Sequence, residues 1–464
     1  MKLNGVTVGP IIGETTPTRV RIWGRGQGDV IDGLPRRCFG ALRYAKAGSG
    51  DWHKPVLFKM NPNFDMTGIA IVEKLEPSTH YEYQMGYFFS DAEISDAGFS
   101  GSDWGNIDIG AFQTASDDDT EPRSLVIGSC RYLLKTFLGD FFDDRGDKTF
   151  RSILEQIDSG SPVHQLLMMG DQIYADDLKF VGQDRSVDKF YKRYRSAFGQ
   201  RYIRDLMSRT PTYMTLDDHE IEDNWPTKAC DKDWKTLYPN AIHAYQSYQL
   251  SHSPNIPIKK RRLTGTPNHF WYKYSDGCCD IFVTDSRTER AHLVDGTSEM
   301  ISQEQMSALK RWLKDASGRV KIVVTSVPFA PDSAQSESKD KWSGYHAQRV
   351  ELLEHIETHQ IERVVFFSGD IHASLSLELV SPTGLKVHSV VSSSFFWPYP
   401  HPSARHFRTK GTIDAGQAGV FSLANPSKVV GDDNFTRVEV APQGMEISVY
   451  GRKGELMDRS VRQF

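Results

Sequence analysis

The stretch LLMMGDQIYADD, residues 166–177, passes from an apolar run into a cluster of acids. Its first part has the length and apolarity of a buried strand. Gly170 and Asp171 follow that run, and Tyr174, Asp176 and Asp177 come shortly after them. Gly-Asp is common in ordinary turns. Active sites of open α/β sheets, however, lie just beyond the carboxyl ends of strands, so this stretch is a candidate site segment if other segments supply partners.

Three more apolar, β-rich runs end in residues that can bind a metal ion. The runs are LVIGSC, TYMTLDDH and VVFFSGDIH, and the residues that end them are Cys130; Asp217, Asp218 and His219; and Asp370 and His372. Gly or Ser often precedes these residues, which lets the backbone turn sharply. If the strands share one sheet, we expect their ends to converge on one spot.

Each of these residues also has an ordinary interpretation. Cys130 alone is more often a small buried hydrophobe than a ligand. The DDHE segment can be a helix N-terminus with Asp218 as its cap, and Tyr174 can simply pack in the core. The joint occurrence of four such strand ends favours a metal site, because the ordinary interpretation needs four separate coincidences.

Length and composition are those of a globular protein with two or three domains. The chain has 464 residues, 39% hydrophobic and 25% charged residues, and a net charge of −5. This balance gives no support for nucleic acid or an anionic membrane as the main partner, although dispersed basic residues can still line a local phosphate site. No apolar run is long enough to span a membrane.

Cysteine usage and the amino-terminal segment bear on the compartment. Five cysteines, few and odd in number, do not form a disulfide framework, which agrees with a reducing compartment. The opening MKLNGVTVGPIIGE lacks the apolar core of a signal peptide. We therefore expect a cytoplasmic protein.

The pattern along the chain predicts two domains and a linker. Residues 1–115 read as strands separated by turns, and LEPSTHYEY resembles the tyrosine corner of fibronectin and immunoglobulin-like sandwiches, in which Tyr81 would cap a loop backbone group. Residues 116–123 form a polar linker. Residues 124–464 alternate short strands with helices, as in an α/β layered core. The segment NFTRVEVAPQGMEISVYG, residues 434–451, predicts two strands that close a sheet edge.

Taken together, the segments GSC, GDQIYAD, LDDHEIEDNW and SGDIHAS resemble the successive motifs of the PhoD-like (alkaline phosphatase D) metallophosphatases. The opening VTVGPIIGETTPTRVRIWGR resembles the N-terminal β-domain of that family, and the likeness extends from about residue 5 to 445. The family belongs to the calcineurin-like phosphoesterase superfamily. The resemblance thus implies a four-layer α/β/β/α catalytic domain with a dinuclear metal centre.

The resemblance also implies a ligand set. Asp171 would bridge two metal ions, Cys130, Tyr174 and His372 would complete one position, and Asp218 and Asp370 would fill the other. The wider superfamily has Asn-His where this chain has Asp218-His219, and Gly-His where it has Gly369-Asp370. Both departures agree with the PhoD-like branch and remove nitrogen from the second position.

The residue types support metals on their own account. A tyrosine ionises at neutral pH only beside a strongly Lewis-acidic ion, which suits Fe3+ at the Cys/Asp/Tyr/His position. Carboxylates and water suit Ca2+, Mg2+ or Mn2+ at the other position, and the resemblance points to Ca2+. Zn2+ is the rival at the first position, although tyrosinate is an unusual ligand for it.

Three further residues are candidates for catalysis. His219 would protonate the leaving oxygen or stabilise charge on the phosphoryl oxygens; the alternative is a purely supporting hydrogen-bond role. Arg131 would contact phosphate or form a surface salt bridge. Asn224 would touch the bound phosphate. The aromatic stretch FFWPYPHP, residues 395–402, would line the cleft or, preferably, pack on the β-domain.

The function that follows is hydrolysis of phosphate esters by a metal-activated hydroxide. Such a centre cleaves monoesters or diesters, and an open cleft would favour diesters such as lipid headgroups. A non-catalytic binding protein would show the loss of a ligand, yet all six expected positions are occupied. A redox reaction at iron is disfavoured by the carboxylate-rich second position. Substrate and oligomeric state stay open.

Overall fold

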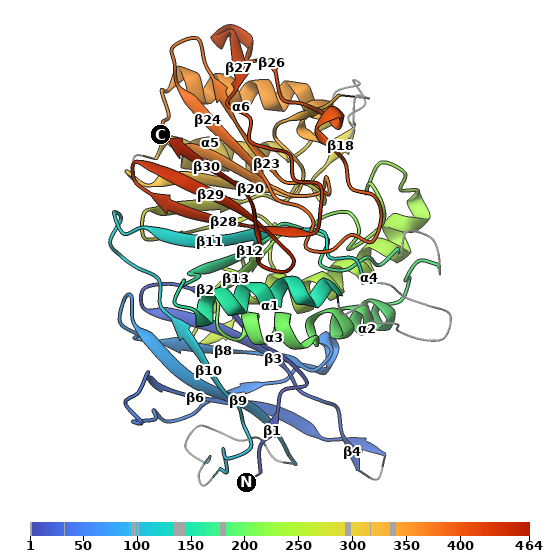
Figure 1. Ribbon diagram of the computed structural model, residues 1–464. Coiled ribbons are helices and arrows are strands. Elements are labelled where there is room, and N and C mark those ends of the chain that lie inside the picture. Colours follow the sequence, from blue (N-terminus) through green and yellow to red (C-terminus); the bar gives the residue numbers. More distant parts are fainter. Residues whose placement is uncertain are drawn as a thin grey trace.

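The computed structural model describes every residue of the chain except 1, 32, 92, 94–98, 100–101, 134–144, 177–181, 293–297, 316 and 335–339. Asp177, one of the acids of the opening stretch, lies outside the described residues. Figure 1 shows the N-terminal strands at one end of the molecule, with the helices α1, α2 and α3 between them and the strands of the remaining chain.

The N-terminal part consists of two antiparallel sheets and a small hairpin. The larger sheet contains β1 (Asn4–Gly5), β9 (His80–Ser90), β6 (Arg37–Lys46), β7 (Val56–Lys59) and β10 (Ile109–Gln113). The smaller sheet contains β2 (Val8–Thr15), β3 (Arg19–Arg25) and β8 (Thr67–Glu73), and the hairpin is β4 (Val30–Ile31) with β5 (Leu34–Pro35).

One hydrophobic cluster joins these two sheets. Ile22 of β3 and Val72 of β8 contribute from the smaller sheet, and Leu42 and Met85 from the larger one. The hydroxyl of Tyr81 accepts a hydrogen bond of 3.0 Å from the backbone N–H of Glu76, as the tyrosine corner predicts. No helix or strand lies between β10 and β11, and β11 begins at Arg123, the last residue of the expected linker. The linker stays a prediction.

Two larger sheets make up the rest of the chain. The first has the order β13 (Thr212–Met214), β12 (Gln165–Met168), β11 (Arg123–Gly128), β28 (Asn434–Ala441), β29 (Gly444–Gly451) and β30 (Leu456–Gln463). The second has the order β16 (Tyr272–Asp276), β17 (Cys279–Val283), β20 (Val320–Thr325), β22 (Val364–Ser368), β24 (Lys386–Val391), β23 (Leu375–Val380), β27 (Val420–Ala424) and β26 (Gly411–Asp414).

The expectation that residues 434–451 close a sheet edge was wrong. Strand β28 pairs with β11 on one side and with β29 on the other, and β30 forms the edge of the sheet. The C-terminal hairpin therefore places β11 in the middle of the sheet. A central position suits β11, because all its residues are buried.

Three clusters of buried residues surround the two sheets. Ile127 and Leu167 of the first sheet share a cluster with Ile322 and Phe367 of the second, so the two sheets pack face to face. The opposite face of the first sheet packs on helices α1 (Arg145–Asp158), α2 (Val187–Phe198), α3 (Arg201–Met207) and α4 (Asp231–Tyr248). The opposite face of the second sheet packs on α5 (Gln303–Lys314) and α6 (His346–Thr358).

Short elements complete the described part of the chain. The two-stranded pairs are β14 (Ile258–Lys259) with β15 (Arg262–Leu263), β18 (Ala291–His292) with β19 (Ser298–Glu299), and β21 (Asp332–Ser333) with β25 (Phe407–Arg408). The short 3-10 helices are η1 (Pro62–Phe64), η4 (Leu250–His252), η5 (Trp342–Tyr345), η6 (Ala404–His406) and η7 (Gly416–Ala418).

Polar contacts fasten the N-terminal sheets to the helices. The carboxylate of Asp65 accepts hydrogen bonds from Arg25 of β3 at 2.9 Å, from Arg195 of α2 at 2.7 Å, and from the hydroxyl of Tyr248 at the end of α4. The indole N–H of Trp23 donates to the carbonyl of Ser247 at 2.8 Å. These contacts tie the two parts of the molecule together.

Among the helices of the described part of the chain, we find none with the length and apolarity needed to cross a membrane.

Candidate metal centre

The strand ends that the sequence predicted converge, but from two sheets rather than one. Strands β11, β12 and β13 are parallel neighbours, so their carboxyl ends lie at one edge and bring Cys130, Asp171 and Asp218 together. Strand β22, which precedes Asp370, belongs to the facing sheet. The two sets meet where the backbone N–H of Asp370 donates to the hydroxyl of Ser129 at 3.2 Å.

Several predicted site residues have a left-handed backbone conformation. The φ angles are 55° at Cys130, 57° at Asp171, 59° at Asn224, 70° at Asp370 and 52° at His372. Positive φ is uncommon for residues other than glycine, and such conformations cluster at functional sites because the surrounding structure must hold them. The backbone therefore marks the same residues as the sequence motifs do.

Two glycines allow the strand ends to approach closely. A Cβ on Gly170, which has a φ of 100°, would lie 2.4 Å from the Cβ of Asp217. A Cβ on Gly369 would lie 2.3 Å from the hydroxyl of Ser129. Any side chain at these positions would push neighbouring loops apart, as we expected from the Gly that precedes each ligand segment.

The carboxylate of Asp171 is the point where the first set of donors meets. Its Oδ2 accepts a hydrogen bond from the hydroxyl of Tyr174 at 3.2 Å and lies 3.4 Å from the Sγ of Cys130. Its Oδ1 accepts from the backbone N–H of His219 at 3.3 Å. Cys130, Tyr174 and Asp171 are all buried, so these three side chains are already gathered in the core.

Glu220 fixes the two loops that carry the aspartates. Its carboxylate accepts hydrogen bonds from the backbone N–H groups of Asp171 at 3.1 Å, Gln172 at 2.6 Å and Asp217 at 2.9 Å. The ordinary interpretation of the DDHE segment was a helix N-terminus, whereas the structure has turns here, and the Glu220 carboxylate bridges two strand ends.

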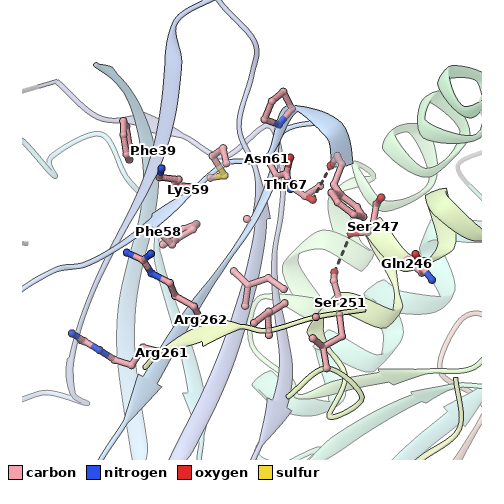
Figure 2. Close-up of a pocket in the computed structure, with 18 of the residues that line it drawn as sticks. Phe39, Phe58, Lys59, Asn61, Thr67, Gln246, Ser247, Ser251, Arg261 and Arg262 are labelled. Carbon is pink, nitrogen blue, oxygen red and sulfur yellow. Dashed lines mark hydrogen bonds between the residues drawn. The ribbon is translucent and has the colours of Figure 1, made fainter. Parts of the chain in front are cut away.

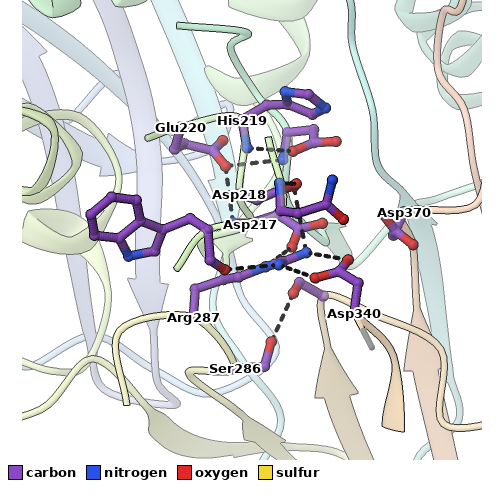
Figure 3. Close-up of polar contacts among 12 residues, drawn as sticks. Asp217, Asp218, His219, Glu220, Ser286, Arg287, Asp340 and Asp370 are labelled. Atoms are coloured by element: carbon purple, nitrogen blue, oxygen red, sulfur yellow. Dashed lines mark hydrogen bonds and ion pairs between the residues drawn. The ribbon is translucent and has the colours of Figure 1, made fainter. Parts of the chain in front are cut away.

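A second group of carboxylates surrounds Arg287, as Figure 3 shows. The guanidinium of Arg287 lies 2.6 Å from Asp217, 3.5 Å from Asp218 and 2.6 Å from Asp340, and it is fully buried. On the other side, the ammonium of Lys341 lies 3.6 Å from Asp370. Arg287 and Lys341 therefore hold these carboxylates in place by ion pairs but do not surround them.

Burial makes Asp217, Asp370 and Asp171 hard to ionise. It raises the pKa of the Asp217 carboxyl to about 7 and that of Asp370 to about 6. Burial, together with the charges of Asp217, Asp218 and Glu220, also raises the pKa of Asp171 well above its usual range. Removal from water disfavours the charged form, and neighbouring like charges add to that cost.

The donor set fits bound cations. Atoms of Asp171, Asp218 and His219 that can bind a metal lie within 4.8 Å of one another, and so do those of Asp217, Asp218 and Asp370. Oδ2 of Asp217 and Oδ1 of Asp218 are buried and accept no hydrogen bond from the described residues. Buried acceptors without a donor are costly, and a cation between these groups would remove that cost.

His219 is oriented by a second aspartate of the opening stretch. Its Nδ1 lies 3.0 Å from both carboxylate oxygens of Asp176, and its ring stacks on Tyr174 with the ring centroids 4.3 Å apart. Burial opposes protonation, but the carboxylates of Asp218, Asp171 and Asp176 outweigh it and raise the pKa of His219 well above its usual range. His219 is thus placed to hold a proton beside the acidic cluster.

The side chain of Arg131 is held elsewhere. Its guanidinium is fully buried, donates to the carbonyl of Ala197 at 2.7 Å and to Gln200, and pairs with Asp147 at 3.5 Å. Of the two roles expected from the sequence, these contacts give it a salt bridge, and a buried one rather than one at the surface.

Asn224 reaches the cluster through its backbone. Its N–H donates to Oδ2 of Asp218, and its side-chain amide donates to Asp223 at 2.7 Å. These contacts hold the Asp218 loop and point the amide nitrogen at a neighbouring carboxylate. A contact between Asn224 and phosphate stays a prediction.

His372 and the aromatic stretch lie at the border of the site. The ring of His372 stacks on Trp397 with the centroids 3.7 Å apart, and Trp397 lies 6.0 Å from Tyr174. Phe395 packs on Phe150 of α1. The preference for packing on the β-domain was therefore wrong for these aromatic contacts, because Trp397 covers a predicted ligand and Phe395 packs in the core beneath it.

The residues that the sequence analysis did not assign are Asp217, Glu220, Asp176, Arg287 and Lys341. Asp217, Asp176 and Glu220 stand inside the quoted motifs, so their spacing was a usable signal. Arg287, in DSRTER, and Lys341 follow no recognisable strand-end pattern. Only the packing of the two sheets brings them to the site.

Comparisons with known proteins agree with this geometry. Residues 143–415 match the sequence model of a family described as PhoD-like phosphatase, an interval that includes Asp171, Asp218 and His372 but begins after Cys130. Alkaline phosphatase D of Bacillus subtilis (strain 168) is 25% identical over 191 residues, which are 36% of this chain and only 32% of that relative's length.

Two solved structures show the same fold. A structure titled "Structure of PhoD" has a TM-score of 0.72 at 16% identity and covers 99% of this chain and 89% of its own. A purple acid phosphatase from yellow lupin (Lupinus luteus) seeds has a TM-score of 0.61 at 11% identity, covering 98% of this chain and 74% of its own. At these identities the likeness concerns the fold alone.

Proposed function

Because the chain belongs to the PhoD-like phosphatase family, we propose that it is a metal-dependent phosphoesterase that hydrolyses phosphomonoesters, phosphodiesters or both. The observation that carries this proposal is the gathering of Cys130, Tyr174 and Asp171 within hydrogen-bond distance in the core. Buried acids next to one another are unfavourable unless a cation compensates their charge.

We assign the metal ligands as the sequence motifs suggest. Cys130, Asp171, Tyr174 and His372 would hold Fe3+, with Zn2+ as the rival, and Asp171, Asp218 and Asp370 would hold Ca2+ or another hard cation. When bound, such a pair of ions supplies charge neutralisation for the phosphoryl group and a nucleophilic hydroxide at neutral pH. Asp217, whose carboxylate lies close to those of Asp218 and Asp370, has no place in this ligand set.

The chain's own groups would divide the remaining tasks. His219, with Nδ1 held by Asp176, would donate a proton from Nε2 to the leaving oxygen. Lys341 would favour the ionised form of Asp370 by its positive charge, and Arg287 would hold the Asp218 carboxylate in position. Trp397, stacked on His372, would exclude water from that side of the site.

The finer architecture is part of the same proposal. The clusters on either side of the two large sheets support the four-layer α/β/β/α domain for residues 124–464. The shared core of the two N-terminal sheets supports a fibronectin or immunoglobulin-like sandwich for residues 1–115. A cytoplasmic location stays a prediction.

Hydrolysis of aryl mono- and diesters by protein loaded with defined metals tests this function. Wild-type protein should release phosphate or phenol in a metal-dependent manner. The Asp171→Asn variant should lose at least about a thousandfold in kcat, because the carboxylate shared by the donor groups loses its charge. The ratio of monoester to diester turnover then gives the substrate class.

A matched control is Asp158→Asn, which removes an exposed carboxylate at the end of α1. This variant should keep wild-type activity. Turnover that survives in Asp171→Asn, or turnover that does not depend on added metal, would contradict the proposed metal centre.

A further inference from the structure

A large cavity lies away from the candidate metal centre, between the N-terminal sheets and the segment that follows α4. Its volume is about 880 Å³, within the size range of small-molecule sites. Figure 2 shows Phe58 and Lys59 of β7 on one side and Gln246, Ser247 and Ser251 on the other. Its lining residues, all in the described part of the chain, include none of the candidate ligands.

The walls of this cavity are largely apolar. They include one aromatic ring that packs directly on the backbone of two glycines. Phe58 of β7 lies against Gly40 of β6 and Gly68 of β8. A Cβ on Gly40 would lie 2.1 Å from the Phe58 ring, and one on Gly68 would lie 2.9 Å from it. These glycines let the ring sit flat on the sheet and leave the space in front of it open.

A strongly basic hairpin borders the opening of the cavity. Lys259, Lys260, Arg261 and Arg262 follow one another, and Lys259 and Arg262 are cross-strand partners in the β14–β15 pair. Only Arg261 and Arg262 of these four line the cavity. Figure 2 shows the guanidinium of Arg262 on the same side as Phe58 and Lys59.

The turn of this hairpin is unusual for its sequence. Lys260 and Arg261 have φ angles of 50° and 56°. Two-residue hairpin turns with positive φ at both positions strongly prefer Asn-Gly or Asp-Gly, because the conformation costs other residues about 1 kcal/mol or more each. Hairpin stability alone does not explain two long cations at these positions.

The charges around the cavity are not balanced. Lys59, Arg261 and Arg262 line it together with a single acid, Glu93. Glu93 pairs with Lys59 at 2.8 Å, and that hydrogen bond, followed by the charges of Lys59, Arg37 and Arg262, lowers the pKa of the Glu93 carboxyl. The pairing of Glu93 with Lys59 leaves a positive excess at the arginine side of the opening.

The contacts of Asp65 link the two walls of the cavity. Asp65 links Arg25 of the N-terminal part to Arg195 and Tyr248 of the helices, at the end of the η1 turn that borders the cavity. The two walls are thus held in a fixed relation, so that a ligand need not pay for ordering them.

We propose that this cavity binds a single-chain amphiphilic anion as a free molecule, with its acyl or alkyl chain against Phe58 and its anionic head at Arg262. An apolar wall favours a hydrocarbon chain through the area it removes from water. A guanidinium at the rim favours a planar carboxylate or a phosphate-like head. The site is separate from the proposed hydrolytic centre and does not depend on it.

Calorimetric titration of the full chain with octane-1-sulfonate, below its micelle-forming concentration, tests the proposal without involving an ester. We expect saturable binding of one molecule per chain. Ethane-1-sulfonate should bind at least about a hundredfold more weakly, because six methylene groups are missing. Octyl glucoside, which has the chain without the charge, should also bind at least about tenfold more weakly.

The hairpin offers a matched pair of variants. Arg262→Glu should weaken octane-1-sulfonate binding at least about tenfold, since it replaces a charge-assisted contact by repulsion. Lys260→Glu makes the same change of charge at the turn of the hairpin, on an exposed residue that does not line the cavity, and should weaken binding by less than about threefold, because exposed charges are screened by salt.

Three results would overturn the proposal. An equal loss in Arg262→Glu and Lys260→Glu would indicate general attraction to a basic surface. If ethane-1-sulfonate bound as tightly as octane-1-sulfonate, the apolar wall would contribute nothing to binding. Binding to anionic phospholipid vesicles without saturable binding of octane-1-sulfonate would indicate a membrane surface instead. The wild-type comparison of chain lengths decides the matter even if Arg262→Glu fails to fold.

Discussion

At the scale of single residues, the candidate ligands are distinguished by backbone and burial together. Cys130, Asp171 and Asp370 combine positive φ with the ends of β11, β12 and β22. A left-handed conformation turns the chain immediately after a strand and aims the side chain along the edge of the sheet. The strained backbone at these three residues therefore sets the direction in which their side chains point.

The phenol of Tyr174 gives the first prediction. The Tyr174→Phe variant should lose the broad visible absorption that a tyrosinate gives on iron, because the hydroxyl next to Asp171 is the only group removed. The ring can keep its stacking on His219. Absorption spectra of purified protein, with iron measured in parallel, check this.

Tyr132→Phe is the matched control, because its ring lies 5.1 Å from Tyr174 in the same aromatic group. It should keep the colour. An unchanged spectrum in Tyr174→Phe at full iron occupancy would show that Tyr174 is not a ligand.

Arg287 gives the second prediction. Arg287→Met should lower the free energy of unfolding by about 3–5 kcal/mol, because it leaves Asp217, Asp218 and Asp340 without their shared cation. It should also reduce metal content after purification, since the Asp218 carboxylate loses its fixed position. Urea unfolding and metal analysis measure the two effects.

Arg290→Met separates these effects. Arg290 pairs with Asp340, but among the described residues it forms no ion pair with Asp217 or Asp218. Arg290→Met should therefore lower stability while metal content stays at the wild-type level. Equal metal content in both variants would mean that Arg287 does not position the ligands.

The fate of Arg131 shows what single-residue reasoning from the sequence leaves out. Its place directly after Cys130 made a phosphate contact plausible, yet its guanidinium points to Ala197 and Asp147 in the helical layer. The left-handed turn at Cys130 decides which way the next side chain points, and no residue type in the sequence announces that turn.

At the scale of elements, the apolar runs predicted strands well because burial on both faces leaves a continuous signal. The segments SLVIG, HQLLMM and RVVFFS became β11, β12 and β22, and helix α2 begins after Ser186 near the place the pattern indicates. Strand β30 was not predicted, because Leu456–Gln463 mixes charged and apolar residues as an edge strand does.

The assignment of strands to sheets was beyond the sequence pattern. Strands β11 and β22 have the same apolar character, yet one lies in each large sheet. Which strands pair depends on long-range contacts such as β28 with β11. Periodicity describes one strand at a time and carries no information about its neighbours.

Strand β24 carries the third prediction, which concerns pH. Burial lowers the pKa of His388 to about 4, and both its ring nitrogens lack hydrogen-bond partners among the described residues. An unfolded chain binds the proton near pH 6.5, so stability is full above that pH and falls as the pH drops toward 4. Between pH 7 and pH 5 the loss should be about 2 kcal/mol.

Urea unfolding of wild type and His388→Leu at the two pH values checks this effect. The variant should lose about 2 kcal/mol less than wild type between pH 7 and pH 5. Groups that titrate in the same way in both proteins cancel in the difference. An identical pH dependence in both proteins would contradict the buried neutral state of His388.

At the scale of the whole molecule, the N-terminal sheets contact the helices of the remaining chain through a few polar groups that each form several or long-range hydrogen bonds. Asp65 joins the β-rich part to α2 and α4, and Trp23 donates to the carbonyl of Ser247. The sequence predicted the two parts, but it gave no indication of this junction, because Asp65 and Arg195 lie 130 positions apart.

The junction supplies the fourth prediction. Asp65→Ala should lower the free energy of unfolding by about 2 kcal/mol, because Arg25, Arg195 and Tyr248 lose their common acceptor. Thermal unfolding followed by circular dichroism measures it. Asp51→Ala, at an exposed turn of the same part, should leave the transition unchanged; an equal shift in both variants would deny the junction a special role.

The central position of β11 has a consequence for synthesis on the ribosome. The hydroxyl of Ser124 donates to the carboxylate of Glu439, a partner translated 315 residues later, so at about 5–20 residues per second this strand waits roughly 15 to 60 s for its neighbour. During that time β11 is an open template for other strands. In a nascent chain that stalls before β28, the loop at Cys130 would lack the support of the complete sheet. Such a chain would need chaperones to avoid aggregation.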